Sequence, residues 1–200
     1  MKKKIFITTE RELGERCKRF AQDNLPDGWE ITNNPDESDV YFSTFSRKIL
    51  TEDFIGGKEG RRCFNFHLGL FPKYRGAGTY SWVIINGETE TGITLHLIDK
   101  GIDTGDVISV GKYPIGEHDT ANDVLDNGTS KAEEMFKSWF VKLVIGDYKA
   151  TKQSGEKHPL FTRVMWEEAH DLTRFFRAFC IQGREQAYYI NQQGEKVYLQ

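Results

Sequence analysis

Apolar and polar residues recur along the chain with two periods, which together predict a sheet flanked by helices. The clearest alternation runs over Thr91–Ile98, where Ile93, Leu95 and Leu97 share one face as in a half-buried strand. Shorter apolar runs between charges or turn residues predict further strands at Ile5–Thr9, Trp29–Ile31, Val40–Phe42, Arg62–His67 and Asp106–Val110. Strands that alternate with helical segments predict an α/β fold with a mostly parallel sheet.

Apolar residues spaced three and four apart predict one long helix, from about Leu125 to a stop at Gly146. Its apolar stripe consists of Ala132, Met135, Phe136, Trp139, Phe140, Leu143 and Val144. We interpret the part from Met135 to Phe140 as core, with an interface between two copies of the chain as the alternative. Shorter helices are predicted at Leu13–Phe20, Ile49–Ile55, Thr79–Ile85 and Leu172–Phe179.

The C-terminal part of the chain predicts a small β-hairpin. Two apolar runs, Ala187–Ile190 and Lys196–Leu199, flank a turn at Gln193-Gly194. The polar stretch Lys152–Pro159 is the one linker-like segment. The hairpin is a second surface that could pair two chains into a homodimer.

Length and composition agree with one domain. The chain has 200 residues, of which 38% are hydrophobic and 28% charged, which is enough apolar material for a sizeable core. We expect a catalytic core at residues 1–150, with the helix and hairpin of residues 151–200 packed on it. The 27 Lys and Arg against 30 Asp and Glu give a net charge of −3, so no strong field draws the chain to nucleic acid or anionic lipid.

The cysteines and the N-terminus bear on the compartment. Cys17, Cys63 and Cys180 are far apart and form no C-x-x-C pair, so they fit neither a disulfide framework nor a zinc site. We therefore predict reduced thiols and no metal. The apolar run at residues 5–9 is too short for a signal peptide or a membrane span, which favours a cytoplasmic protein without a membrane partner.

Residues 64–106 hold the polar groups with the clearest chemistry. Asn65 and His67 are two apart on a predicted strand, so their side chains share a face. Asp103 follows another strand, and because strand ends gather at one edge of an open α/β sheet, we expect its carboxylate to approach the imidazole.

An amide, an imidazole and a carboxylate suit the attack of an amine on an activated acyl group. The amide can donate to a developing oxyanion, the imidazole can exchange protons with the amine, and the carboxylate can orient the imidazole. Spacing alone leaves the alternative that Asn65 and His67 cap a strand and that Asp103-Thr104-Gly105 is a plain turn.

The order of motifs resembles the folate-dependent formyltransferases. N-x-H-x-x-x-x-P-x-x-R-G is followed by T-G-I-T-x-H and then by I-D-T-G-D, all within residues 65–106, and the likeness continues to the C-terminal segment. The resemblance implies an abbreviated Rossmann-like formyltransferase core with a small C-terminal helix and hairpin. It also implies 10-formyltetrahydrofolate as the formyl donor, and Asn65, His67 and Asp103 as the catalytic residues.

The same resemblance implies the residues that bind folate. In the family the pterin ring lies against the loop before the aspartate and against an apolar segment, which correspond here to Lys100, Gly101, Ile102, Ile49 and Leu50. Ordinary core packing is the alternative for the last two. The family usually has another strand and helix before the N-x-H motif, so the N-terminal sheet should be abbreviated and part of the folate pocket altered.

The acceptor amine is predicted from the branch of the family. Methionyl-tRNA formyltransferase has a C-terminal tRNA-binding barrel, for which a chain ending at Gln200 leaves no room. Glycinamide ribonucleotide transformylase opens with a Gly-rich phosphate turn, whereas Thr8–Arg11 stands here. The segments Phe45–Asp53 and Arg75–Tyr80 resemble the nucleotide-sugar N-formyltransferases, which implies an amino-deoxysugar nucleotide used for surface glycans such as lipopolysaccharide.

Two alternatives belong to other classes of function. Formyltetrahydrofolate hydrolases share the three catalytic residues, but the family members with that activity carry an N-terminal regulatory domain that is not expected here. A binding module that keeps the fold without catalysis is the second alternative.

Cationic and aromatic residues near the motif are candidates for binding the acceptor. Lys73 and Arg75 could meet a diphosphate, and Tyr80 or Trp82 could stack on a base. Arg75 could instead bond to loop carbonyls, and Trp82 could be core. We predict that His96 is a hydrogen-bonded structural histidine, with a place on the wall of the crevice beside Thr94 as the alternative.

Overall fold

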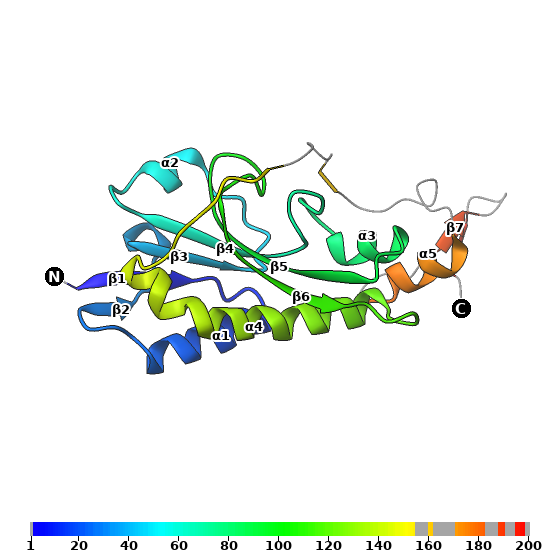
Figure 1. The fold of residues 1–200 in the computed structure, drawn as a ribbon, viewed down its shortest axis with the longest axis horizontal. Helices are drawn as coiled ribbons and strands as arrows, with labels where there is room; N and C mark the ends of the chain where they lie inside the picture. Colours follow the sequence, from blue (N-terminus) through cyan, green and yellow to red (C-terminus); the bar gives the residue numbers. More distant parts are fainter. Residues whose placement is uncertain (1, 155–159, 162–170, 183–187, 191–194, 199–200) are drawn as a thin grey trace.

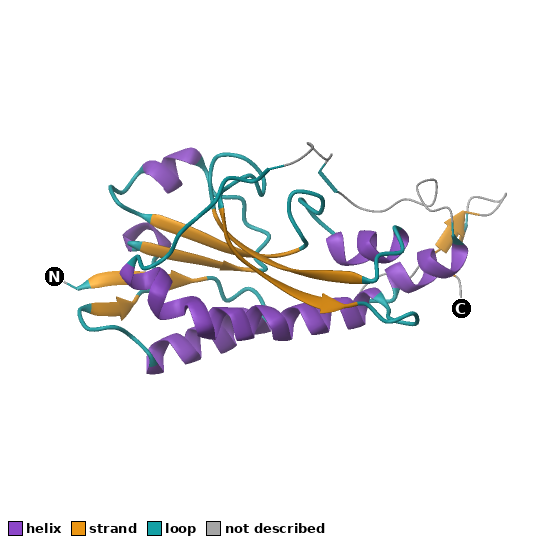
Figure 2. Cartoon of the chain, viewed as in Figure 1, coloured by secondary structure: helices purple, strands orange, loops and turns teal. Residues whose placement is uncertain are grey.

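The computed structural model describes residues 2–154, 160–161, 171–182, 188–190 and 195–198. The strands of its main sheet are β1 (Lys3–Ile7), β2 (Trp29–Ile31), β3 (Val40–Thr44), β4 (Arg62–Leu68), β5 (Glu90–Leu97) and β6 (Val107–Pro114). The helices are α1 (Glu12–Asp23), α2 (Glu52–Gly56), α3 (Thr79–Ile85), α4 (Ala121–Ile145) and α5 (Leu172–Phe179). Helices α1 and α4 lie side by side along one face of the sheet (Figures 1 and 2).

The sheet has the strand order β2-β1-β3-β4-β5-β6. Strands β2, β1, β3 and β4 are parallel, β5 runs antiparallel to β4, and β6 runs antiparallel to β5. Five strands therefore point one way and β5 points the other, which confirms a mostly parallel sheet. The connection from β2 to β3 holds only a 3-10 turn, Pro35–Glu37. Strands β1, β2 and β3 have three to five residues, whereas β4, β5 and β6 have seven or eight.

Alternation along β4 decides which residues enter the core. Phe64 and Phe66 point to the helical face, where the Phe66 ring lies 5.6 Å from that of Phe136 on α4. Phe136 also packs against Phe42 of β3, 5.3 Å away, and both rings are fully buried. Met135, Phe136 and Phe140 of the stripe on α4 are therefore core, as predicted, whereas Trp139 is only partly buried.

Helix α4 begins at Ala121, four residues before the predicted start. Thr120 closes a capping box, in which its hydroxyl accepts from the Asp123 amide and the Asp123 carboxylate accepts from the Thr120 amide. This polar signal precedes the apolar stripe, so periodicity alone misses the first turn. The helix ends at Gly146, whose φ of 87° suits a glycine C-cap, as predicted.

A similar cap moves the start of α2. Its first residue is Glu52 rather than Ile49, because the Thr51 hydroxyl accepts from the Phe54 amide and begins the helix there. The predicted strand at Asp106–Val110 is longer in the structure, since β6 continues beside β5 as far as Pro114.

The C-terminal elements also follow the prediction. Helix α5 packs on α3, where the Ser81 hydroxyl donates to the Ala178 carbonyl at 2.6 Å. Strands β7 (Tyr188–Ile190) and β8 (Lys196–Tyr198) form an antiparallel pair. The predicted turn at Gln193-Gly194 and residues 155–159 of the predicted linker lie outside the described residues. Among the described helices, none is both long and apolar enough to cross a lipid bilayer.

Candidate active site

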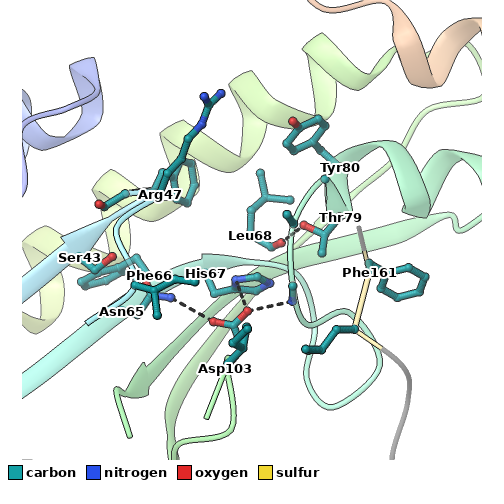
Figure 3. Close-up of a pocket in the computed structure, with 18 of the residues that line it drawn as sticks. Ser43, Arg47, Asn65, Phe66, His67, Leu68, Thr79, Tyr80, Asp103 and Phe161 are labelled. Carbon is teal, nitrogen blue, oxygen red and sulfur yellow. Dashed lines mark hydrogen bonds and ion pairs between the residues drawn. The ribbon is translucent and has the colours of Figure 1, made fainter. Parts of the chain in front are cut away.

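The polar residues of β4 face away from the helical core, as their spacing predicts. Asn65 and His67 are both partly buried and line the same cavity, while the residues between and beside them point to α4 (Figure 3). The cavity has a volume of about 1100 Å³. A pocket of this size can hold two substrates side by side.

Asp103 lies on this face of the sheet, but not for the reason predicted from the sequence. The expected gathering of strand ends at one edge does not apply, because β5 is antiparallel and ends beside Phe64. Instead, the loop between β5 and β6 folds back across the sheet, with Asp103 in the left-handed region at a φ of 54°. One carboxylate oxygen, Oδ2, accepts from the Gly76 amide at 2.9 Å and lies 3.3 Å from His67 Nδ1. The three predicted catalytic residues therefore meet in the structure (Figure 3).

His67 is bonded on both sides of its ring. Nε2 lies 2.9 Å from the Tyr74 carbonyl, so this nitrogen carries a proton and donates, because a carbonyl can only accept. The contact depends on Gly69, since a Cβ there would lie 2.4 Å from the Tyr74 oxygen and 3.0 Å from Nε2. Burial under Phe71, whose ring lies 4.9 Å away, lowers the pKa of His67, and the Asp103 carboxylate opposes that effect.

His96 on β5 orients the amide of Asn65. Its Nδ1 lies 2.7 Å from the Leu97 carbonyl and must donate to it, so Nε2 accepts from Asn65 Nδ2 at 3.1 Å. Burial lowers the pKa of His96 and keeps the ring neutral. Asn65 Nδ2 is 3.5 Å from Asp103 Oδ1, a weak contact that leaves one N–H available to a ligand. His96 is thus hydrogen-bonded as predicted, and it also lines the cavity, as the alternative held.

All five residues predicted to bind folate line the cavity. The backbone turn at Lys100–Ile102 and the segment at Ile49 and Leu50 lie on its wall. Core packing does not explain Ile49, because 75% of its surface is exposed. Ile102 is 44% exposed. Exposed apolar side chains on a cavity wall are what a flat aromatic ligand would cover.

Of the four residues predicted to bind the acceptor, only Tyr80 lines the cavity. Lys73 instead pairs with Glu88 at 2.5 Å on the surface. Trp82 packs on Phe161, with ring centroids 4.9 Å apart, and Arg75 also lies outside the cavity wall. Trp82 lies on α3 and packs against the core, which confirms the alternative given for it.

Three cations that were not predicted to bind the acceptor lie on the cavity wall, where Lys73 and Arg75 were expected. Arg11 comes from the start of α1, and Arg47 and Lys48 come from the loop after β3. Glu10, in the connection between β1 and α1, accepts from the Ser46 hydroxyl of that loop at 2.9 Å. Arg47 and Lys48 belong to the segment Phe45–Asp53, which resembles the nucleotide-sugar enzymes, but nothing in the spacing of the sequence tied these residues or Arg11 to His67.

The other reactive groups of the described chain do not form a site. No cluster of His, Cys, Asp and Glu that could hold a metal occurs among the described residues. Burial raises the pKa of the Cys17 thiol to about 12 and that of Cys63 to about 11, so both stay protonated. Cys17 and Cys63 are free and buried.

The mostly parallel α/β sheet and the meeting of Asn65, His67 and Asp103 on one cavity wall agree with the result of a comparison with known protein families. The formyl transferase family model matches residues 32–140. The chain therefore belongs to the formyl transferase family.

Relatives and solved structures extend that comparison. A methionyl-tRNA formyltransferase from Caldanaerobacter subterraneus is 40% identical over 121 residues, which are 59% of this chain and 39% of that protein. A bifunctional polymyxin resistance protein ArnA from Wigglesworthia glossinidia is 48% identical over 84 residues, 42% of this chain and 12% of its own length. The chain spans well under half the length of these relatives.

A sugar N-formyltransferase structure from Shewanella superposes with a TM-score of 0.83 over 98% of this chain and 96% of its own, at 20% identity. A 4-N formyltransferase from Francisella tularensis gives a TM-score of 0.80 over the same shares, also at 20% identity. Likeness at this identity concerns the fold, and it confirms the Rossmann-like formyltransferase architecture that the motifs implied.

Proposed function

We propose that the chain transfers a formyl group from 10-formyltetrahydrofolate to the amino group of a nucleotide-linked amino sugar. The observation that carries the proposal is the meeting of Asn65, His67 and Asp103 on the wall of one large cavity. An amide donor, a proton-exchanging imidazole and an orienting carboxylate are the groups that acyl transfer to an amine needs.

The cavity wall supports a folate donor. The exposed apolar side chains of Ile49 and Ile102 offer contact to a flat ring, and the backbone at Lys100–Gly101 offers polar groups beside it. Two similar structures are described as complexes with formylated folates, one with 5-N-formyl-THF and one with folinic acid. Such a donor supplies an electrophilic formyl carbon and a nitrogen that leaves once it is protonated.

His67 exchanges protons through Nδ1 in the proposed reaction. Its Nε2 proton is held by the Tyr74 carbonyl, so the lone pair of the neutral ring lies at Nδ1. A proton taken up there points at Asp103 Oδ2, 3.3 Å away, and the carboxylate charge stabilises the imidazolium. The His67–Asp103 pair can thus take the proton that the attacking amine loses, hold it between Nδ1 and Oδ2, and release it to the leaving nitrogen as the new C–N bond forms and the old one breaks.

Asn65 serves the oxygen of the formyl group. As the amine attacks, that oxygen gains negative charge, and the Asn65 N–H that is only weakly bonded to Asp103 can donate to it. The other N–H stays on His96 Nε2, which keeps the amide in one orientation. A preoriented donor loses little free energy to reorganisation when the charge develops.

The cations on the wall support a phosphorylated acceptor. Arg11 and Arg47 offer two guanidinium groups, and guanidinium binds phosphate with paired hydrogen bonds. Tyr80 on the same wall offers a ring on which a base can stack. One similar structure, from Helicobacter canadensis, is described as a complex with dTDP-3-aminofucose, and the Shewanella structure that aligns over 96% of its own length is a sugar N-formyltransferase.

Methionyl-tRNA is the second candidate acceptor. It rests on one observation, the 40% identity with a methionyl-tRNA formyltransferase over 121 residues. The same cavity chemistry would apply to the amino group of a charged tRNA, so the acceptor has to be decided by experiment.

Mass spectrometry of the products tests the proposal. The protein is incubated with 10-formyltetrahydrofolate and a panel of amino-deoxysugar nucleotides, with methionyl-tRNA and no acceptor as parallel reactions. We expect one sugar nucleotide to gain the mass of a formyl group. Formyl-methionyl-tRNA would move the chain to the second candidate, equal donor consumption without acceptor would indicate a hydrolase, and an untouched donor in every reaction would contradict formyl transfer.

The titration of His67 gives a separate prediction. Burial lowers the pKa of His67, so the ring of the free protein should gain its proton below the ordinary value of 6.5 as the pH falls. The neutral form, which can accept a proton, is then favoured above pH 6.5. An NMR titration of the ring protons, assigned by their loss in His67→Gln, checks this, and a midpoint above 6.5 would contradict it.

A further inference from the structure

The segment after α4 returns to the loop that carries Asp103. Thr151 forms a two-bond bridge with Val107, both N–O distances being 2.8 Å, and this bridge fixes the segment beside the start of β6. Two residues on, Gln153 Nε2 donates to the Asp103 carbonyl at 2.9 Å and to the Gly105 carbonyl at 2.8 Å. One amide group therefore ties together both sides of the turn at Asp103.

The turn needs such a tie because its backbone is unusual. Asp103 has a φ of 54°, which costs a non-glycine residue about 1 kcal/mol or more. The neighbouring contacts set the rest of the loop: Asp99 accepts from the Gly101 amide at 3.0 Å and from the Thr104 hydroxyl at 2.6 Å. These bonds hold the first half of the loop, whereas the Gln153 amide bonds hold the carbonyls at and after Asp103.

We infer that Gln153 is a positioning residue, which holds the Asp103 carboxylate against His67 through the backbone of the loop. The Gln153 amide is suited to this because its two N–H groups meet two carbonyl acceptors. Its Oε1 is buried and has no hydrogen-bond partner among the described residues, so the observed orientation is kept by the Nε2 bonds. Gln153 lies beyond the stretch that the family model matches, in the segment that the sequence predicted as a linker.

The inference rests on the proposed function for its effect on rate, but not for its effect on His67. The titratable groups that face the His67 ring in the described structure are Asp103 and His96. If Gln153 holds Asp103 in place, its removal moves the carboxylate away and weakens its support of the imidazolium. The pKa of His67 then falls, whether or not the protein transfers formyl groups.

Gln153→Leu is the test, because leucine fills similar space, stays neutral and lacks the two donors. We expect the NMR pKa of His67 to fall and kcat for formyl transfer to fall about ten- to hundredfold, with KM for the donor within about twofold of the parent. Gln153→Ala is measured alongside in case the leucine variant does not fold. Lys152→Ala is the matched control, since its side chain is exposed in the same segment.

A second background separates positioning from general stability. In Asp103→Asn, which lacks the carboxylate charge, Gln153→Leu should leave the His67 pKa and the residual kcat almost unchanged. A fall in melting temperature with an unchanged His67 pKa would overturn the inference, and so would an equal loss in both backgrounds. If the parent shows no formyl transfer, the His67 titration still decides the role of Gln153, and only the proposed function fails.

Discussion

Replacement of His67 by glutamine lowers kcat for formyl transfer by about 10³-fold, the middle of the range for a proton-exchanging group. Glutamine keeps a polar group of similar length but cannot take a proton near neutral pH. Asp103→Asn should cost a similar factor, because the neutral amide no longer stabilises the imidazolium at Nδ1, 3.3 Å away. Turnover is measured with the acceptor that the mass spectrometry identifies.

The double variant distinguishes cooperation from two separate defects. Since His67 and Asp103 act as one unit, His67→Gln with Asp103→Asn should be no more than a few-fold slower than either single variant. His118→Gln is the control, because that imidazole is exposed and far from the loop motifs in the sequence. Near-normal turnover in either single variant would contradict the catalytic assignment.

Phe136→Ala should lower the free energy of unfolding by about 3–5 kcal/mol, the cost of removing a buried aromatic ring from a packed core. The ring is fully buried between the strands and the helices, 5.3 Å from Phe42, 5.6 Å from Phe66 and 5.3 Å from Phe140. A domain typically has only about 5–15 kcal/mol of stability, so the variant should be close to unfolding at room temperature.

Urea denaturation followed by circular dichroism measures this change. Val141→Ala on the same helix is the control, because Val141 is 42% exposed. We expect its free energy of unfolding to change by less than about 1 kcal/mol, since the lost contact and the gain in helix propensity are both small. Equal losses for the two variants would mean that the helix is not anchored through Phe136.

The helices and strands could be predicted from the sequence where the periodicity of apolar residues was strong. The alternation at Thr91–Ile98 and the stripe before Gly146 predicted β5 and α4, because each period reports one buried face. The errors fell at element ends. Thr51 and Thr120 begin their helices through side-chain hydrogen bonds, which an apolar pattern does not register.

The site was readable where chemistry and spacing coincide along one strand. The side chains of Asn65 and His67 share a face because residues two apart on a strand always do. The approach of Asp103 was predicted for the wrong reason, since the reversal of β5 is a property of the whole sheet and not of the loop sequence. The Tyr74 carbonyl and the Gly76 amide make their contacts with backbone atoms, which the type of a side chain does not predict.

The prediction of which cations line the cavity was wrong for a related reason. Lys73 and Arg75 are close to the motif in sequence, but neither lines the cavity: Lys73 pairs with Glu88 on the surface, and the Nε of Arg75 is buried elsewhere. Arg11 and Arg47 reach the cavity from the ends of β1 and β3, which the parallel sheet brings to one side. Closeness to a motif in the sequence therefore does not predict which residues line a pocket at the edge of a sheet.

The hydrogen bond between His67 Nε2 and the Tyr74 carbonyl has a consequence for how the site can vary among homologues. Every residue has a carbonyl, so the side chain at position 74 can change while the ring keeps the same acceptor and the same tautomer. Position 69 has no such freedom, because any side chain there would crowd both atoms of the bond. The tautomer of His67 thus depends on Gly69, a residue without a side chain.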